Sequence, residues 1–225
     1  MKISAKEAAA VLNMSQDQIY QFIQHQEIPC QKMSEDYFFN RAELLEWATS
    51  KGIAVSPDLF SNKDDEEEAL PKLSEAIQRG GILYNIEGTT KTEVLRSIVD
   101  RMPLPAHINR QFLFQTLIAR ESLGSTGIGN GIAIPHVRNP LILHVEDPII
   151  CLCFLKTPID FKSIDGKSVN TLFTIISPTV RTHLHLLSRI TYMLKQKEFL
   201  ELVQKQGSSI EEILKVLNKI ESQLL

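Results

Sequence analysis

The segment from residue 120 to residue 136 reads RESLGSTGIGNGIAIPH and ends on a histidine in a stiff turn. Pro135 restricts Ile134 to an extended conformation, so the backbone presents His136 in a fixed direction. Arg120 stands at the start of the same segment, and a guanidinium group binds oxyanions through paired hydrogen bonds. An arginine and a histidine at the two ends of a glycine-rich segment favour a site for an anionic group.

Glycines occupy positions 124, 127, 129 and 131 between these two residues. Glycine permits tight turns and close approach of the backbone, and successive amides can bind an anion. Two nucleotide-binding interpretations fail. A Walker loop needs Lys followed by Ser or Thr after the glycines, and a dinucleotide fold has the order strand, glycines, helix. Here the glycines follow a predicted helix and precede a predicted strand, so we expect a loop that delivers one histidine.

A second pair of histidines lies in a helix predicted from Thr179 to Leu194. The helical spacing places His183 on the apolar, inward face and His185 on the wet face. Position alone would favour a packing or capping role for His183. A metal site formed by His136, His183 and His185 is a further alternative, which is disfavoured because the two helix histidines point apart and no acidic ligand is indicated.

Helices and strands are interspersed along residues 73–225, which favours an α/β layered domain with a mixed central sheet flanked by helices. Capping residues and hydrophobic spacing predict the helices, and short apolar runs predict the strands. The predicted helices begin at Ser74, Thr90, about Asn109 and Thr179, with two more in the last thirty residues, and the predicted strands are Ile132–Ile134, Ile149–Leu155 and Val169–Ile176.

Three motifs in this part of the chain resemble the phosphotransferase-system (PTS) IIA domain of the fructose/mannitol class, and its nitrogen-regulatory branch most of all. They are RESLGSTGIGNGIAIPH, PIDFKSIDGKSVNTLFTIISP and HLHLLSRI, and the resemblance spans roughly residues 73–222. It implies that His136 accepts a phosphoryl group, that Arg120 stabilises this group and that His183 orients it or donates a hydrogen bond.

The same resemblance implies a phosphoryl-binding loop and a set of partners. Backbone amides around Gly127, Gly129 and Gly131 would bind phosphoryl oxygens, and Ser125 and Thr126 could donate further hydrogen bonds or merely cap the loop. The donor would be an HPr-type phosphocarrier, and the acceptor a IIB subunit or a regulatory target. We expect this phosphoryl transfer to need no metal and no cofactor.

Residues 1–55 show the order of elements of a small winged helix-turn-helix domain. Polar capping residues start each helix, and a hairpin lies between the second and third helices. The signals are a capping box at Ser4 and Glu7, a tight turn at Asn13 and Met14, a second capping box at Ser15 and Gln18, a hairpin at residues 28–39 and a third helix capped by Asn40.

Residues 2–49 resemble the excisionase/MerR-type winged helix-turn-helix family, through EAA in the first helix, Ser at the start of the second, Ile-Pro before the wing and a terminal Leu-x-x-Trp. The family binds DNA through its second helix and wing. Here the second helix has no Lys or Arg, although phosphate contacts need them. DNA binding and a protein-interaction role therefore both stay open, and the residues expected to face a partner are Gln16, Gln18, Gln21, Gln24 and Lys32.

Charge divides the chain into three parts. Residues 56–72 carry two basic and six acidic side chains, a net −4 with a run of five acids, which predicts a solvated linker. Residues 1–55 carry a net −2 and residues 73–225 a net +3. We therefore predict a helix-turn-helix domain at 1–55, an acidic linker at 56–72 and a IIA-like domain at 73–225.

Composition excludes several classes of protein. Hydrophobic residues make up 43% of the 225, which is enough for a core, and the formal charge of −3 excludes a histone-like polycation. Three cysteines without a CxxC pair disfavour a disulfide scaffold or a zinc knuckle. The absence of a long apolar run predicts no membrane span and no secretory signal, so we expect a cytoplasmic protein.

These observations favour a phosphohistidine-carrying regulatory protein, phosphorylated on His136 by an HPr-type carrier and coupled to regulation through the N-terminal domain. The alternative is a phosphoryl relay to a separate sugar-transporter IIB subunit, with the N-terminal domain as a protein-interaction module.

Overall fold

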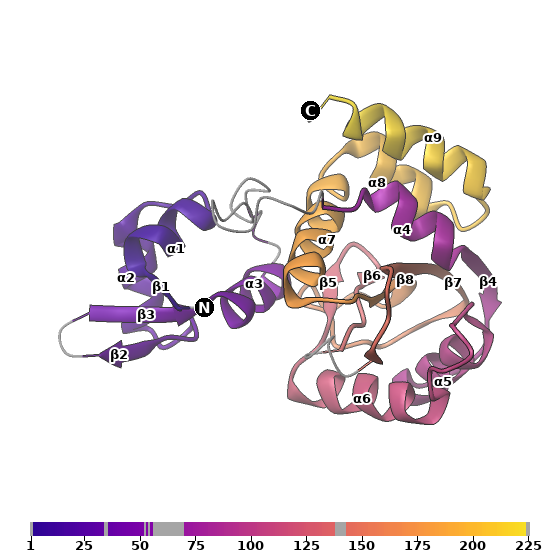
Figure 1. Ribbon diagram of the computed structural model, residues 1–225, viewed down its shortest axis with the longest axis horizontal. Helices are drawn as coiled ribbons and strands as arrows, with labels where there is room; N and C mark the ends of the chain where they lie inside the picture. Colours follow the sequence, from indigo (N-terminus) through magenta and orange to yellow (C-terminus); the bar gives the residue numbers. More distant parts are fainter. Residues whose placement is uncertain are drawn as a thin grey trace.

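The computed structural model describes residues 2–33, 36–51, 53, 55, 70–137 and 143–223. Two sheets organise these residues (Figure 1). A three-stranded sheet lies in the N-terminal part, and a five-stranded sheet lies in the rest of the chain. Most of the predicted linker falls on residues 56–69, outside the described residues. The predicted domain boundaries stay a prediction.

The N-terminal unit, residues 2–55, combines the small sheet with three helices. Its strands pair antiparallel in the order β1-β3-β2, and β2 and β3 form the predicted wing. Both predicted capping boxes are formed, by Ser4 with Glu7 and by Ser15 with Gln18. The elements are β1 (Lys2–Ser4), α1 (Ala5–Val11), α2 (Gln16–Gln24), β2 (Gln31–Met33), β3 (Asp36–Asn40) and α3 (Arg41–Ser50).

The larger unit, residues 70–223, is built on a mixed sheet of order β4-β7-β8-β6-β5. Strand β7 pairs parallel with β4 and antiparallel with β8, and β6 pairs parallel with β8. The strands are β4 (Ile82–Ile86), β5 (Gly127–Gly129), β6 (Ile132–Ala133), β7 (Ile149–Ile159) and β8 (Val169–Ile176).

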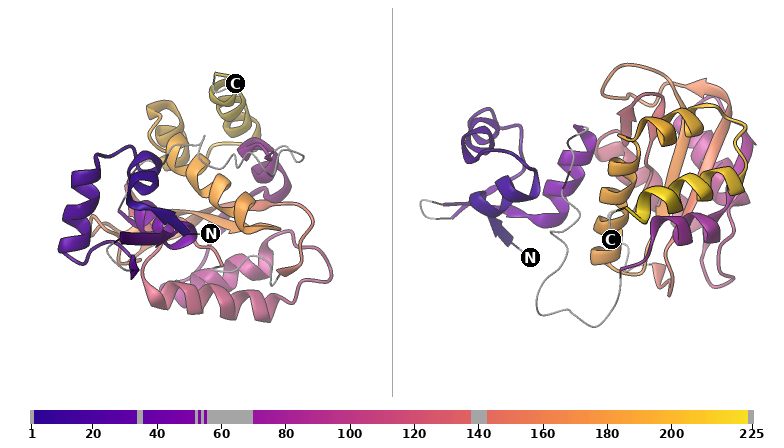
Figure 2. Two further views of the ribbon diagram at one scale, coloured as in Figure 1. Left: turned by 60° about the vertical axis from the view of Figure 1, so that its left-hand side comes forward. Right: turned by 90° about the horizontal axis from the view of Figure 1, so that it is seen from above.

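Helices cover both faces of this sheet (Figure 2), and a hydrophobic cluster lies between the sheet and each helical layer. One cluster joins the sheet to α5 and α6, and the other joins it to α4, α7, α8 and α9. The helices are α4 (Leu73–Gly80), α5 (Lys91–Arg101), α6 (Arg110–Leu123), α7 (Val180–Met193), α8 (Lys197–Gln204) and α9 (Ile210–Glu221). The predicted fold class, a mixed sheet flanked by helices, is confirmed.

The glycine-rich segment differs from the predicted loop. Residues 127–133 form a tight hairpin in which β5 pairs antiparallel with β6. Asn130 and Gly131 are its two turn residues, with φ of 54° and 76°. Positive φ at both central positions suits a type I′ turn, and Asn-Gly is the preferred pair for it. The segment thus continues the sheet toward His136.

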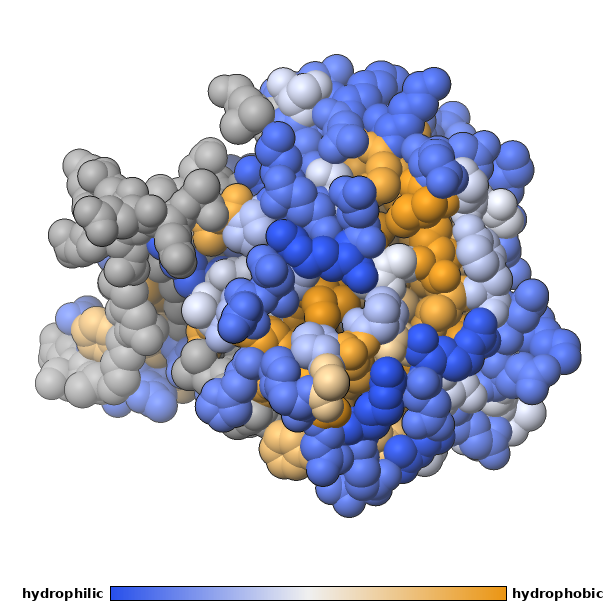
Figure 3. All heavy atoms as spheres, turned by 45° about the vertical axis from the view of Figure 1, so that its right-hand side comes forward, coloured by the Kyte–Doolittle hydropathy of each residue, from blue (hydrophilic) through white to orange (hydrophobic). Residues whose placement is uncertain are grey.

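The surface of the larger unit is mostly hydrophilic, with an apolar band on the side that Figure 3 shows. Within the described residues, no helix combines the length and the apolar character that crossing a membrane requires.

Candidate functional site

His136 lies where strand β6 ends, beside the neighbouring strand β8. The Ile175 amide donates to the Pro135 carbonyl at 3.0 Å, and His136 forms a bridge to Ile175. The His136 side chain is almost fully buried, with 2% of the residue exposed. Its Nδ1 lies 2.7 Å from the carbonyl oxygen of Ile134. A carbonyl only accepts, so Nδ1 carries the proton and Nε2 of the neutral ring carries the lone pair.

Arg120 reaches this lone pair from the last turn of α6. Its Nε donates to Nε2 of His136 at 3.3 Å, and its NH1 donates to the carbonyl of Gly124 at 3.0 Å. Arg120 is itself buried, with 8% exposed. A buried cation beside a histidine lone pair is suited to an anion that forms or arrives at that nitrogen.

His183 lies beside the His136 ring, in the first turn of α7. The two ring centroids are 5.0 Å apart, and Nδ1 of His183 lies 3.1 Å from the hydroxyl of Ser177. Within the described part of the chain its buried Nε2 has no hydrogen-bond partner. Burial is the main cause that lowers the pKa of His183 well below its usual value, and the neighbouring His136 and Arg120 act in the same direction. The ring is therefore neutral at pH 7.

Glu121 fixes the start of the glycine-rich segment, a role that the sequence analysis missed. Its carboxylate accepts from the Thr126 hydroxyl at 2.6 Å and from the Thr126 amide at 3.2 Å. Lys91 of α5 forms an ion pair with the same carboxylate at 2.7 Å. The position of Glu121 directly after Arg120, in a partly apolar helix, was the available signal.

The predicted phosphoryl-binding loop is only partly assembled at His136. Ser125 and Thr126 line the same cavity as Arg120 and His136. Their hydroxyls are engaged, since Ser125 donates to the Phe161 carbonyl and Thr126 donates to Glu121. The predicted glycines Gly127, Gly129 and Gly131 belong to the hairpin and are not among the residues that line this cavity.

The cavity at the histidine is very small. Its lining residues include Ser125, Thr126, Ile128, Ile134, Arg120 and His136, together with Thr49 from the end of α3. Its free volume is about 10 Å³, which is roughly the space of one water molecule. The N-terminal unit therefore contributes one wall of the site.

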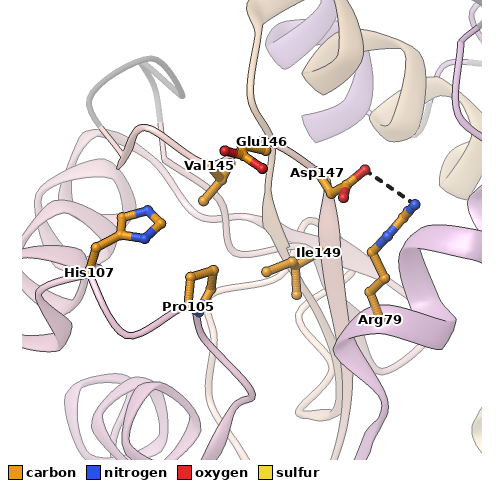
Figure 4. Close-up of a pocket in the computed structure, with 7 residues that line it drawn as sticks. All are labelled: Arg79, Pro105, His107, Val145, Glu146, Asp147 and Ile149. Carbon is orange, nitrogen blue, oxygen red and sulfur yellow. Dashed lines mark ion pairs between the residues drawn. The ribbon is translucent and has the colours of Figure 1, made fainter.

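A larger pocket lies elsewhere, between α4, the loop before α6 and the start of β7 (Figure 4). Its volume is about 400 Å³, and an ion pair of 3.2 Å between Arg79 and Asp147 crosses its rim. His107 lines this pocket and lies 3.1 Å from the carbonyl of His144. None of the predicted site residues lines this pocket.

The prediction for His185 was wrong. The side chain is buried, with 5% exposed, and its Nε2 lies 3.1 Å from the carbonyl oxygen of Pro71. The chain before α4 covers the face of α7 that helical spacing alone assigned to solvent. In the part of the chain that the structure describes, no cluster of three metal-ligating side chains is found.

The predicted partner-facing residues of the N-terminal unit lie on its surface. Gln16, Gln21, Gln24 and Lys32 are exposed. Gln18 is exposed as well, but its side-chain oxygen accepts from the Ser15 amide at 2.9 Å and closes the capping box. Lys32 lies over the Tyr37 ring at 5.7 Å. These side chains do not meet the histidine site.

Comparison with known proteins identifies both units. Residues 75–220 match the family model of the phosphoenolpyruvate-dependent sugar phosphotransferase system, EIIA 2, and residues 3–52 match a helix-turn-helix domain. A nitrogen regulatory protein of Pseudomonas aeruginosa is 39% identical over 56% of this chain and 82% of its own length. The fructose-specific EIIABC component of Bacillus subtilis is 31% identical over 66% of this chain and 23% of its own length.

A solved structure agrees with this relationship. The nitrogen regulatory protein IIA-Ntr from Neisseria meningitidis superposes with a TM-score of 0.52 at 28% identity, over 66% of this chain and 96% of that one. The chain therefore belongs to the EIIA 2 family of the phosphotransferase system, has nitrogen regulatory proteins among its relatives, and carries a helix-turn-helix domain on its N-terminal side.

Proposed function

We propose that this protein is a phosphohistidine carrier of the IIA-Ntr type, in which Nε2 of His136 accepts a phosphoryl group from an HPr-type phosphocarrier. One observation carries the proposal. The Ile134 carbonyl holds the proton on Nδ1, which leaves the lone pair of Nε2 directed at the guanidinium of Arg120.

The transfer is a nucleophilic displacement at phosphorus. The lone pair of Nε2 forms the new P–N bond, and the bond between phosphorus and the donor nitrogen breaks, with its electron pair returning to the donor imidazole. Such a step depends on in-line positioning and on stabilisation of the phosphoryl oxygens. The fixed tautomer of His136 removes any need to move a proton before the attack.

Two side chains are placed to bind the phosphoryl oxygens. Arg120 already contacts Nε2 of His136, so its N–H groups can bind oxygens that arrive there. His183 can supply a further donor if the Ser177 hydroxyl donates to Nδ1, because the proton then resides on Nε2, which has no hydrogen-bond partner among the described residues. A neutral donor suits this position, since it adds no charge beside Arg120.

Exposed apolar side chains supply a docking surface for the donor. Leu123 is 69% exposed and follows Arg120 in α6, and Val180 is 37% exposed and precedes His183 in α7. Ile164 is 53% exposed, and its amide donates to the Gly127 carbonyl of the hairpin. Apolar residues at the centre of an interface exclude water from the reacting groups.

Intact-mass measurement tests the carrier function. The protein is incubated with phosphoenolpyruvate and the enzyme I and HPr-type carrier of the same organism. We expect one acid-labile phosphoryl group on the wild type and on His107→Ala, an exposed histidine outside the site, and none on His136→Ala. Equal phosphorylation of His136→Ala would contradict the assignment.

The N-terminal unit favours a regulatory output over a simple relay. We propose that it binds DNA or a protein through α2 and the wing, and that phosphorylation of His136 changes this binding. The exposed glutamines of α2 can bind adenine edges, while Lys32 is the cation that the wing contributes to phosphate contacts. The donor and the three free cysteines fit a reducing, cytoplasmic setting.

Two measurements separate regulation from relay. Fluorescence anisotropy, with DNA from the promoter region of the gene that encodes this protein, tests whether the N-terminal unit binds DNA. The measurement is made on the phosphorylated and the unphosphorylated protein. Transfer from the phosphorylated protein to purified IIB subunits tests the relay. Fast transfer to a IIB subunit, with DNA affinity absent in both states, would favour the relay and a protein-interaction role for the N-terminal unit.

A further inference from the structure

The N-terminal unit packs directly against the helix that carries His183. Helix α3 lies beside α7 in both views (Figures 1 and 2). Leu184 of α7 belongs to the hydrophobic cluster of the N-terminal unit, with 4% exposed, and Val55 belongs to the same cluster. The hydroxyl of Ser188 donates to the Val55 carbonyl at 3.2 Å. An apolar contact and a hydrogen bond thus join the two units next to the site.

The end of α3 forms one wall of the site. Thr49 is the last buried α3 residue described, with 7% exposed, and it lines the cavity of Arg120 and His136. The free volume of about 10 Å³ accepts one water molecule. A phosphoryl group brings one phosphorus and three oxygens, and an in-line donor needs a second ring on the far side of the phosphorus. Neither fits in a cavity of this volume, in which Thr49 forms one wall.

We propose that α3 is an internal plug of the phosphohistidine site: the N-terminal unit must leave α7 before a phosphocarrier can reach His136, and a phosphoryl group on His136 keeps it away. This inference rests on the proposed function of His136. The N-terminal unit and the reacting group of the carrier compete for the space at His136, so the apparent rate of phosphorylation is proportional to the fraction of molecules that are open.

The plug links the site to the helix-turn-helix surface in both directions. Phosphorylation releases the N-terminal unit, because a dianion with its oxygens does not fit beneath Thr49. Coupling of this kind is reciprocal, so any partner that binds the released unit more tightly also speeds phosphorylation. Helix α2 lies on the far side of the N-terminal unit from α7 (Figure 1), so the predicted partner-facing glutamines are exposed in the closed form. Phosphorylation therefore changes whether the N-terminal unit is held against α7, and it does not change the exposure of α2.

An opened variant provides the first test. Leu184→Asp places a charge in the apolar contact while leaving Arg120, His136 and His183 in place. The control, Tyr20→Asp, adds the same charge at an exposed position of α2. With the phosphorylated HPr-type carrier as donor, we expect Leu184→Asp to be phosphorylated about tenfold or more faster than the wild type, and Tyr20→Asp to match the wild type.

A locked variant provides the second test and does not depend on how Leu184→Asp folds. Ser188 and Val55 are in contact, so Ser188→Cys with Val55→Cys is designed to form a disulfide in a Cys30→Ser background. We expect the oxidised protein to accept no phosphoryl group and the same sample to accept one after reduction. Phosphorylation of the oxidised, cross-linked protein at the wild-type rate would overturn the plug and leave the carrier function intact. Failure of the wild type, the opened and the reduced proteins alike would overturn both.

Discussion

Nε of Arg120 lies 3.3 Å from Nε2 of His136, and the second ring nitrogen of that histidine lies 2.7 Å from the Ile134 carbonyl. The two contacts act together. The carbonyl fixes the proton, so the lone pair points toward the cation, and the cation stands where the phosphoryl oxygens would arrive. Arg120 holds this position through its bond to the Gly124 carbonyl, at the end of the helix that carries it.

Replacing Arg120 tests whether the shape of the guanidinium matters as well as its charge. Arg120→Lys keeps the positive charge but loses the paired donors that bind two oxygens at once. We expect the rate of phosphorylation to fall by about 100-fold, a loss typical of removing one donor to a developing oxyanion. Rapid-quench measurement with the phosphorylated carrier checks this rate. Arg110→Lys, on the same helix but bonded to the carbonyls of Val99 and Met102, is the matched control.

His183 is expected to act on the phosphorylated form. Its buried Nε2 has no partner in the described structure, and a phosphoryl oxygen on His136 would provide one. His183→Ala should therefore shorten the lifetime of phosphohistidine about tenfold, the effect of losing one hydrogen bond to a charged group. His183→Gln, which restores an N–H donor, should recover part of this lifetime. The decay of the phosphorylated mass at pH 7 measures the lifetime in each variant. Identical lifetimes in the wild type and both variants would contradict a role of His183 in stabilising the phosphoryl group.

Glu121 is expected to stabilise the segment that leads to the site. Its buried carboxylate accepts hydrogen bonds from three donors, the Thr126 hydroxyl, the Thr126 amide and the Lys91 ammonium, and Glu121→Gln replaces it with a group that lacks the charge. We expect the free energy of unfolding to fall by about 1–3 kcal/mol. Urea unfolding of Glu121→Gln, Lys91→Met and the double variant measures the effect and the coupling. Strictly additive losses would mean that the ion pair contributes nothing of its own.

Part of the candidate site was predictable because its signals are local. Pro135 fixes the backbone before His136, and Arg120 begins the same short segment, so both residues could be named from one stretch of sequence. Helical spacing placed His183 inward but favoured a packing role, and only the resemblance assigned it to the site. The contacts of Glu121 were harder to predict, because its partner Lys91 lies on another helix. Local sequence patterns do not show which side chains of two separate helices come into contact.

The errors have physical causes too. Asn130-Gly131 is a strong hairpin signal, but the glycines on either side suggested a loop. Strand β4 was missed because its pairing with β7 is long-range, and β1 was missed because a three-residue strand carries little pattern. His185 was assigned to solvent because helical spacing says nothing about which segment covers a helix. The position of Thr49 beside Arg120 and His136 depends on the packing of two units, which no local pattern encodes.

His185 makes the stability of the larger unit depend on pH. Burial, followed by the positive charge of Arg189, lowers its pKa from 6.5 to about 4, although the bond to the Pro71 carbonyl opposes the shift. His185 therefore binds a proton below about pH 6.5 in the unfolded chain, but only below about pH 4 in the folded protein. Stability is complete above pH 6.5 and falls as the pH drops toward 4, by about 2 kcal/mol at pH 5 for this residue.

Urea unfolding at pH 7 and pH 5 measures this loss. The wild type should lose more stability than His185→Gln, and the difference between them should be about 2 kcal/mol. His183 adds a loss of the same sign to both proteins, so it cancels in the comparison. Arg189→Gln should also flatten the dependence, because removing that charge lets the folded histidine accept its proton at higher pH. If His185→Gln follows the wild type at both pH values, the burial of His185 does not control the acid response.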